Sequence, residues 1–280
     1  MKLLEIVRNC GIFAEDMKIS PFLREEDTSE YEVWLVSAGE QKYVLKKAKG
    51  REMAVYAEFF AEETAGAPRL LGSCGDYFLM EYVQGEDLCR CDRARLSLAL
   101  DALIALQDRY WAYADGFFAD SLAHRRKRGE YLGDAELEQA YGKFLDLYER
   151  LPRTLCHDDL LPFNVLVSEE KATIIDWECA GILPYPTSLA RLIAHGTGEA
   201  DAFFYMTEAD RAFAIDYYYE NLIRGKGIPY ADYRRALDYF LLYEYCEWIM
   251  LGNKYPDADM TRYHFYLEKA QAHVAVKGLA

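Results

Sequence analysis

Side chains suited to transferring a phosphoryl group lie in the segment H-D-D-L-L-P-F-N at residues 157–164, which leads into a short apolar run. Such a transfer needs a carboxylate that orients the attacking hydroxyl and accepts its proton, and an amide oxygen that coordinates magnesium on the phosphates. Asp159 suits the first role and Asn164 the second. Asp176 follows the apolar residues 173–175, where its carboxylate can supply a second magnesium ligand. The segment therefore predicts magnesium-dependent transfer of a phosphoryl group to a hydroxyl.

Two kinds of periodicity predict the elements that position this segment. Three short stretches before residue 84 have the short period of strands, two apolar stretches joined by a polar turn follow after residue 163, and residues 51–63 have helical spacing. The predicted strands are 31–36, 42–46, 77–83, 164–167 and 172–176. After Gly85 the remaining pattern is mainly helical. The chain is therefore expected to begin as a small sheet with one helix and to continue as a larger helical part.

The segment resembles the catalytic loop of the aminoglycoside phosphotransferase and choline kinase superfamily of small-molecule kinases, whose usual form is H-G-D-L-H-P-x-N. Asp158 stands in place of the glycine and Leu161 in place of the second histidine. Further along, Ser188 stands where relatives usually have aspartate before Leu-Ala. By the same resemblance, His157 is a structural residue that supports the loop.

This resemblance implies an α+β, bilobal, protein-kinase-like fold. Residues 1–83 would form a small, sheet-rich nucleotide-binding lobe, and residues 84–280 a larger, mainly helical lobe that carries the catalytic and substrate-binding residues. It also implies ATP and Mg²⁺ as cofactors and a small hydroxyl compound as the substrate.

The lysine and glutamate of such a kinase site have candidates upstream. Lys46 ends the run Y-V-L-K and resembles the lysine that contacts the α- and β-phosphates. Strand alternation puts it on the same face as Val44, which favours it over Lys47. Glu52 resembles the glutamate that pairs with this lysine, with Glu58 on the same predicted helix as the alternative.

Two other segments resemble the parts that hold the nucleotide. The run L-M-E-Y-V-Q-G resembles the hinge between lobes, where backbone groups of Glu81 and Val83 would hydrogen-bond adenine. The phosphate loop would be residues 24–30, which contain four acids and no glycine, so that Thr28 or Ser29 would donate hydrogen bonds to phosphate. This loop leaves open an alternative, a catalytically silent kinase fold that binds nucleotide as a scaffold.

The composition limits the partners. A formal charge of −15 and a pI near 4.8 argue against nucleic acid and favour small cationic substrates. The apolar stretch at 96–106 is interrupted by Asp101 and is too short to span a bilayer, so no membrane partner is expected. Seven cysteines without a C-x-x-C pair fit reduced thiols, which predicts a cytoplasmic protein.

The expected acceptor is a small cationic compound with a hydroxyl, such as an amino sugar or an amino alcohol. Glu244 and Glu247 lie among tyrosines and a tryptophan, and carboxylates beside aromatic faces suit an ammonium group. The alternative is that these rings only pack helices. Asp158 and Glu178 are further candidate carboxylates, whereas the basic run at 124–128 is interpreted as a solvated loop. The sequence leaves open the identity of the acceptor, the choice between ATP and GTP, and the oligomeric state.

Overall fold

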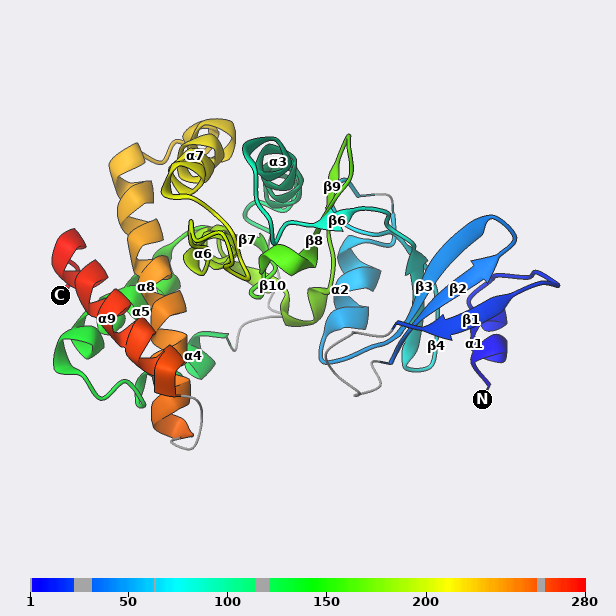
Figure 1. Cartoon of the computed structure of the whole chain (residues 1–280), viewed down its shortest axis with the longest axis horizontal. Coiled ribbons are helices and arrows are strands. Elements are labelled where there is room, and N and C mark those ends of the chain that lie inside the picture. The colour runs from blue at the N-terminus through cyan, green and yellow to red at the C-terminus, as the bar shows by residue number, and fades with distance from the viewer. Residues whose placement is uncertain (1, 23–31, 63, 114–120, 256–259) are drawn as a thin grey trace.

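The chain folds into two lobes. A computed structural model describes residues 2–22, 32–62, 64–113, 121–255 and 260–280. A sheet built from the N-terminal strands lies at one end of the molecule, and most of the helices lie at the other (Figure 1). This is the expected α+β architecture, with a small sheet-rich lobe and a larger helical lobe.

The N-terminal lobe is built on a five-stranded antiparallel sheet in the order β1-β2-β3-β5-β4. Its strands and helices are β1 (Lys18–Pro21), β2 (Val33–Ala38), β3 (Gln41–Lys47), β4 (Leu70–Cys74), β5 (Tyr77–Glu81), α1 (Leu3–Asn9) and α2 (Glu52–Phe59). Alternation along β5 assigns one helix to each face of the sheet. Leu79 packs with α1, whereas Phe78 and Met80 belong to the core that contains α2.

Helix α2 is shorter than the predicted helix at 51–63. The carbonyl of Phe59 accepts hydrogen bonds from Thr64 Oγ1 (3.2 Å) and from the hydroxyl of Tyr110 (2.7 Å). These side-chain donors satisfy a carbonyl at the end of the helix, so the helix can stop there. The predicted strand at 77–83 likewise ends earlier, at Glu81.

Strand β4 was not predicted, because Gly72 and a register shift interrupt the period-2 alternation by which a strand is recognised. The pairing of β4 with β5 shifts between Leu70 and Gly72. A Cβ added at Gly72 would lie 2.4 Å from the backbone O of Cys10, so only glycine lets the end of α1 approach this strand.

The C-terminal lobe contains α3 (Arg93–Arg109), α4 (Ser121–Gly129), α5 (Ala135–Arg150), α6 (Pro186–Ala194), α7 (Glu208–Tyr218), α8 (Tyr230–Lys254) and α9 (Met260–Lys277). Its strands are β6 (Glu86–Asp87), β7 (Arg153–Cys156), β8 (Val165–Val167), β9 (Ala172–Ile174) and β10 (Gly181–Pro184). They form a sheet in the order β6-β8-β9 and a β7–β10 pair. Asp92, Asp134 and Thr207 cap α3, α5 and α7 by accepting backbone hydrogen bonds.

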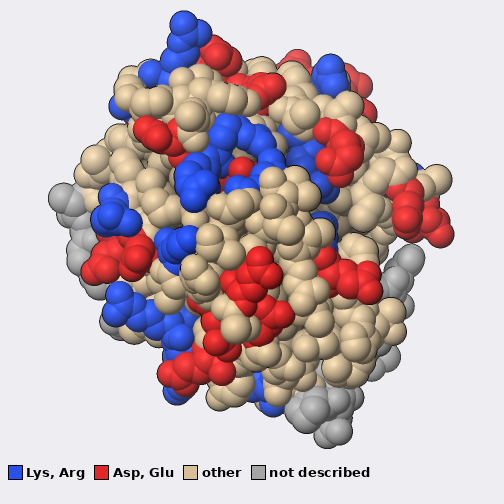
Figure 2. Space-filling model, turned by 90° about the vertical axis from the view of Figure 1, so that its left-hand side faces the viewer, with Lys and Arg blue, Asp and Glu red and all other residues tan. Residues whose placement is uncertain are grey.

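Helix α8 is central to this lobe and packs against α5, α6 and α9. Four of its tyrosines, Tyr233, Tyr239, Tyr243 and Tyr245, are at most 4% exposed, so these rings pack the helices together. Among the described helices, none has both the length and the apolar character needed to cross a membrane. On the face at this end of the molecule, basic and acidic side chains are interspersed (Figure 2).

The hairpin formed by β8 and β9 is the element that positions the predicted chemistry. Both strands are shorter than predicted, because the chain leaves the ladder after Ile174. The backbone N–H of Ile175 donates to the carbonyl of Asn164 over 2.9 Å, and Asp176 then takes a left-handed conformation with φ 65°. The two predicted magnesium ligands therefore flank the same end of one hairpin.

Candidate active site

His157 holds the loop that follows β7. Its ring is buried, and Nε2 donates a hydrogen bond to the carbonyl of Ile175 over 2.8 Å. Its backbone N–H donates to Ser188 Oγ over 2.9 Å. Burial lowers the pKa of His157, which keeps the ring neutral near pH 7. The contacts of His157 therefore tie the loop both to the strand end beside Asp176 and to α6.

Asp159 and Asn164 are joined by one hydrogen bond. Nδ2 of Asn164 donates to the backbone carbonyl of Asp159 over 2.9 Å, across the 3₁₀ turn Pro162–Asn164. Asn164 lines the cleft between the lobes, whereas Asp159 lines a second pocket. Because Nδ2 is already bonded, Oδ1 is the atom of Asn164 left to bind a cation.

Lys46 lies between two carboxylates contributed by different parts of the chain. Its Nζ is 2.8 Å from Oε1 of Glu52 on α2, and it also contacts Oδ1 of Asp176. Lys46 and Glu52 are both buried. The structure therefore brings together a lysine, a glutamate and an aspartate that the sequence selected from three separate segments.

The alternatives to this lysine and glutamate lie elsewhere. Lys47 binds Glu32 over 2.6 Å, and both side chains are at least one-third exposed. Glu58 accepts a hydrogen bond from the hydroxyl of Tyr113 instead of facing Lys46. Strand alternation separates Lys46 from Lys47, and helical periodicity separates Glu52 from Glu58.

The acids around Lys46 fit a divalent cation. Carboxylate oxygens of Glu52, Asp176 and Glu178 all lie within 4.8 Å of one another. Lys46 takes Oδ1 of Asp176, which leaves Oδ2 available. Oε2 of Glu52 is buried with no hydrogen-bond partner among the described residues, and burial raises the pKa of Glu52 to about 7 despite the opposing charge of Lys46. A set of oxygen donors beside an unpaired buried oxygen suits Mg²⁺.

The cleft between the lobes has a volume of about 890 Å³, which is within the range of small-molecule sites. Val44 and Met80 supply apolar walls, and Lys46, Asn164 and Asp176 supply polar ones. Val44 and Lys46 therefore share one face of β3, as the alternation predicts. An apolar wall beside cationic and oxygen-bearing groups can take a flat base at one side and phosphates at the other.

Glu81 and Val83 also line this cleft. The backbone N–H of Glu81 is bonded to the carbonyl of Arg69 over 3.1 Å, so this N–H is not available to a base. Ser29, with the rest of the predicted phosphate loop at 24–30, lies outside the described residues.

A second pocket, of about 560 Å³, opens beside Asp159 and carries charges of both signs. Its charged lining residues are Arg51, Arg125, Arg128, Arg191, Asp158, Asp159, Glu178 and Glu247. Glu178 forms no ion pair with any described residue. Asp159 therefore lines a pocket that is separate from the cleft and has charged walls.

The basic run at 124–128 is not a solvated loop, which corrects the interpretation from sequence. It lies in α4, and Arg125 is only 2% exposed. Its guanidinium binds Asp158 and lies 4.7 Å from the ring centre of Tyr148 and 4.9 Å from that of Tyr243. Burial raises the pKa of Asp158 to about 6, although Arg125 opposes this shift. Asp158 has φ 51°, a left-handed conformation that suits the glycine usual at this position.

Glu244 and Glu247 lie on one face of α8, but they face an arginine of the protein itself. Arg191 Nη1 is 2.8 Å from Oε2 of Glu244 and 2.7 Å from Oε2 of Glu247. Arg191 also binds Oδ1 of Asp159, with 2.7 Å from Nη2 and 3.1 Å from Nε. Sequence reasoning missed this arginine, and the departure at neighbouring Ser188 is the signal that could have drawn attention to α6.

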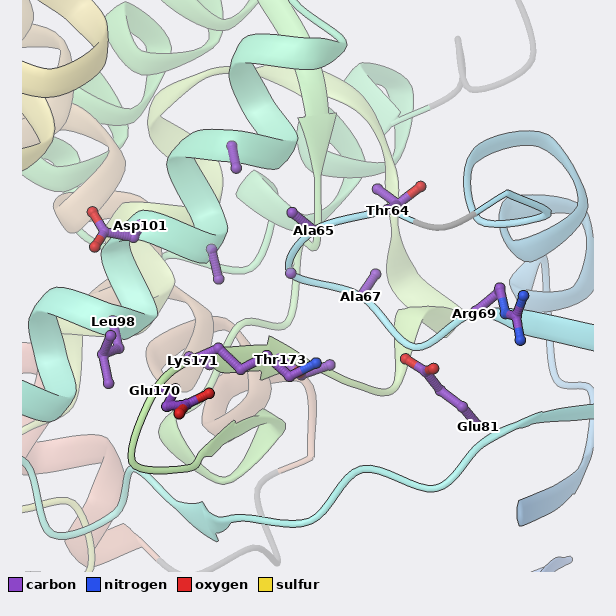
Figure 3. Close-up of a pocket in the computed structure, with 14 residues that line it drawn as sticks. Thr64, Ala65, Ala67, Arg69, Glu81, Leu98, Asp101, Glu170, Lys171 and Thr173 are labelled. Atoms are coloured by element: carbon purple, nitrogen blue, oxygen red, sulfur yellow. The ribbon is translucent and has the colours of Figure 1, made fainter. Parts of the chain in front are cut away.

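A third cavity, of about 410 Å³, lies between residues 64–69, α3 and the hairpin of β8 and β9 (Figure 3). Arg69 and Glu81 lie at one end of it, and Asp101 lies at the other (Figure 3). Of the predicted site residues that the structure describes, only Glu81 lines this cavity. It is therefore separate from the side chains that gather around Lys46 and Asp159.

The sheet lobe and the helical lobe thus meet near a lysine, an asparagine and two aspartates. The chain belongs to the phosphotransferase enzyme family, whose model matches residues 23–222. Among curated protein sequences, none matches this chain.

Solved structures of kinases share the fold at low sequence identity. Plasmodium vivax ethanolamine kinase superposes with a TM-score of 0.64 and 13% identity, covering 95% of this chain and 84% of its own. An aminoglycoside phosphotransferase from Alicyclobacillus acidocaldarius superposes with a TM-score of 0.61 and 16% identity, and the match covers 99% of this chain and 95% of that one. A thermostable mutant of another aminoglycoside phosphotransferase was solved in a ternary complex with AMP-PNP and hygromycin B. It superposes with a TM-score of 0.60 and 17% identity, and the match covers 93% of this chain and 94% of that one.

Proposed function

We propose that this protein transfers the γ-phosphoryl group of ATP, with Mg²⁺, to a hydroxyl of a small molecule. The observation that carries the proposal is the hydrogen bond from Asn164 Nδ2 to the backbone carbonyl of Asp159. It joins a residue of the nucleotide-sized cleft to a residue of the second pocket. A donor in one cavity and an acceptor in the other would meet at this junction, as an in-line transfer requires.

The side chains of the cleft have complementary roles toward the nucleotide. Lys46 would contact the α- and β-phosphates, with its position fixed by the ion pair to Glu52. Backbone groups of Glu81 and Val83 would meet adenine, and Ser29 would donate to phosphate. Each of these contacts with the nucleotide requires a donor or a charge that the folded chain holds in place before the nucleotide binds.

Asn164 and Asp176 would hold the metal, through Oδ1 of the amide and Oδ2 of the carboxylate. Bound there, Mg²⁺ would neutralise charge on the phosphates. Glu178 lies close enough to Asp176 to contribute a further oxygen directly or through water. Asp159 would accept a hydrogen bond from the acceptor hydroxyl, orient it, and take its proton as the new O–P bond forms.

The proposed acceptor is cationic, in the class of amino sugars and amino alcohols. The charge of −15 would concentrate cations around the protein, and Glu178 lines the second pocket without a described ion-pair partner. The similarity to an ethanolamine kinase agrees with this class. Glu244 and Glu247 do not support a cationic acceptor, because both form ion pairs with Arg191. We place the enzyme in the cytoplasm, where ATP is supplied and cysteines stay reduced.

The test is a panel of hydroxyl compounds assayed for ADP release with Mg²⁺ and ATP, and in parallel with GTP. The panel contains aminoglycosides, choline, ethanolamine and neutral sugars, and Asp159→Asn protein is the negative control. Phosphorylation of a cationic acceptor that the control does not catalyse is the expected result. Phosphorylation of neutral sugars alone would contradict the cationic acceptor, and ATP binding without any transfer would favour a scaffold role.

A further inference from the structure

Arg191 of α6 contacts the carboxylate that the proposed mechanism depends on. Both of its contacts with Asp159 go to the same atom, Oδ1, from Nη2 at 2.7 Å and from Nε at 3.1 Å. Oδ2 therefore has no part in this contact. A hydroxyl that approaches from the second pocket needs one carboxylate oxygen with a free lone pair, and Oδ2 is the oxygen that Arg191 leaves for it.

The other side of Arg191 is fixed by α8. Nη1 binds Glu244 and Glu247, and Glu247 also binds Arg128. The Arg191 side chain is 14% exposed and that of Glu244 is 2% exposed, so these charges interact with little screening by solvent. Burial opposes ionisation of Glu244, but the charges and hydrogen bonds of Arg191 and His195 together outweigh it and lower the pKa of Glu244. The guanidinium thus has one orientation, set by two glutamates of a buried helix.

We propose that Arg191 is a positioning residue for phosphoryl transfer: held by Glu244 and Glu247, it fixes the rotamer of Asp159 so that Oδ2 faces the acceptor. The inference rests on the function proposed above. A planar guanidinium suits this role because it can bind carboxylates along two edges at once, whereas an ammonium has no fixed fork.

A purely structural ion pair would explain fewer of these contacts. Glu244 and Glu247 alone would neutralise Arg191, yet the side chain extends further and makes two hydrogen bonds to the partly exposed Asp159, whose side chain is 37% exposed. Fixing a side chain at this exposure costs conformational entropy. The gain is a carboxylate held in one orientation before the acceptor binds.

The test compares Arg191→Met and Arg191→Lys with Arg211→Met. Arg211 is a matched control, because its side chain has the same 14% exposure and forms an ion pair with Glu208 over 2.9 Å on α7. With an acceptor identified in the panel, kcat should fall roughly 10- to 10²-fold in Arg191→Met and less in Arg191→Lys. The Kd of Mg-ATP should change less than about twofold, because the cleft is intact. Arg211→Met should keep its kcat.

A double-mutant cycle separates positioning from loss of stability. If Arg191 acts through Asp159, adding Arg191→Met to Asp159→Asn should lower the residual kcat little further. A further fall as large as that in the unmutated background would overturn the proposal, as would a folded Arg191→Met protein with unchanged kcat. If Arg191→Met lowers the unfolding midpoint below the assay temperature, Arg191→Lys takes its place in the cycle.

Failure of the proposed function would look different. If the protein binds Mg-ATP but transfers phosphate to no acceptor, the proposed function is wrong, and the role proposed for Arg191 is wrong with it. A protein in which Asp159→Asn abolishes transfer but Arg191→Met does not lower kcat keeps the function and loses only this inference.

Discussion

The hydroxyl of Ser188 accepts a hydrogen bond from the backbone N–H of His157 over 2.9 Å, at the position where the family resemblance has aspartate. Ser188 and His157 are both 0% exposed, so this bond lies in the interior. A serine oxygen can replace a carboxylate oxygen as the acceptor without burying a charge. Ser188 therefore joins α6 to the loop at 157–164 without a buried charge.

Ser188→Ala should destabilise the protein by about 1–3 kcal/mol, because it leaves a buried backbone N–H without a partner. The measurement is urea unfolding. Ser97→Ala is the control, since Ser97 is partly exposed and, among the described residues, its hydroxyl bonds to the carbonyl of Arg93 within its own helix. Equal unfolding free energies for the two variants would contradict the role given to Ser188.

Lys46→Met should weaken Mg-ATP binding and lower turnover, whereas Lys47→Met should do neither. Lys46 is buried between Glu52 and Asp176, and Lys47 pairs with Glu32 near the surface. Removing the charge of Lys46 should cost roughly 10²-fold in kcat/KM, in line with the loss of one preorganised electrostatic contact. Calorimetric titration of Mg-ATP into both variants checks this. A stronger effect from Lys47→Met would reverse the assignment.

Sequence patterns predicted the parts of the site that depend on local periodicity. Alternation placed Lys46 and Val44 on one face of β3, and the strand pattern predicted one hairpin that begins at Asn164 and ends at Asp176, which the structure brings side by side. The order of these parts along the chain then indicated the two-lobed fold.

The parts that sequence could not predict depend on contacts between distant elements. Arg191 and Asp159 are 32 positions apart, and Arg125 and Asp158 are 33 apart. Nothing in the spacing distinguishes these arginines from solvated ones, because only the packing of α4, α6 and α8 around the catalytic loop brings the charges together. The same packing pairs Glu244 and Glu247 with Arg191, whereas the sequence alone predicted that these two carboxylates bind a cationic acceptor.

Asp159→Asn should lower turnover by roughly 10²- to 10⁴-fold, because the amide cannot accept the proton of the hydroxyl. Mg-ATP affinity should stay nearly unchanged, since Asp159 lines the second pocket and not the cleft. Turnover on the identified acceptor and calorimetric binding of Mg-ATP are measured side by side. Turnover that survives the substitution would show that another group takes the proton.

Asp176→Ala should abolish the magnesium dependence of ATP binding. Asp176 is one of the two proposed ligands, with Asn164, and its loss should leave too few protein oxygens for the hydrated ion even with Glu178 nearby. The affinity for ATP is compared with Mg²⁺ and with excess chelator, in both the unmutated protein and the variant. If the unmutated protein binds ATP equally well under both conditions, the metal site is wrong.

The burial of His157 predicts that acid destabilises the protein through this ring. Nε2 donates to the carbonyl of Ile175, so Nδ1 carries no proton, and among the described residues it has no hydrogen-bond partner. Protonation would place a charged, unpaired N–H in the interior, which is why burial lowers the pKa of His157. The unfolded chain takes up this proton as the pH falls below about 6.5, whereas the folded chain does not until lower pH.

The contribution of His157 to the free energy of unfolding should therefore decrease as the pH falls from about 7.5 to about 5.5, and this contribution is absent in His157→Gln, which cannot titrate. Glu52 and Asp158, whose pKa values burial raises, contribute with the opposite sign in the same range and equally in both proteins, so the difference between the two proteins isolates His157. Glutamine keeps an amide donor for Ile175, so the variant is expected to be less stable at neutral pH but less sensitive to acid. Urea unfolding of both proteins at several pH values measures the difference. A difference that stays constant across this range would mean that the ring takes up its proton equally in the folded and unfolded chains.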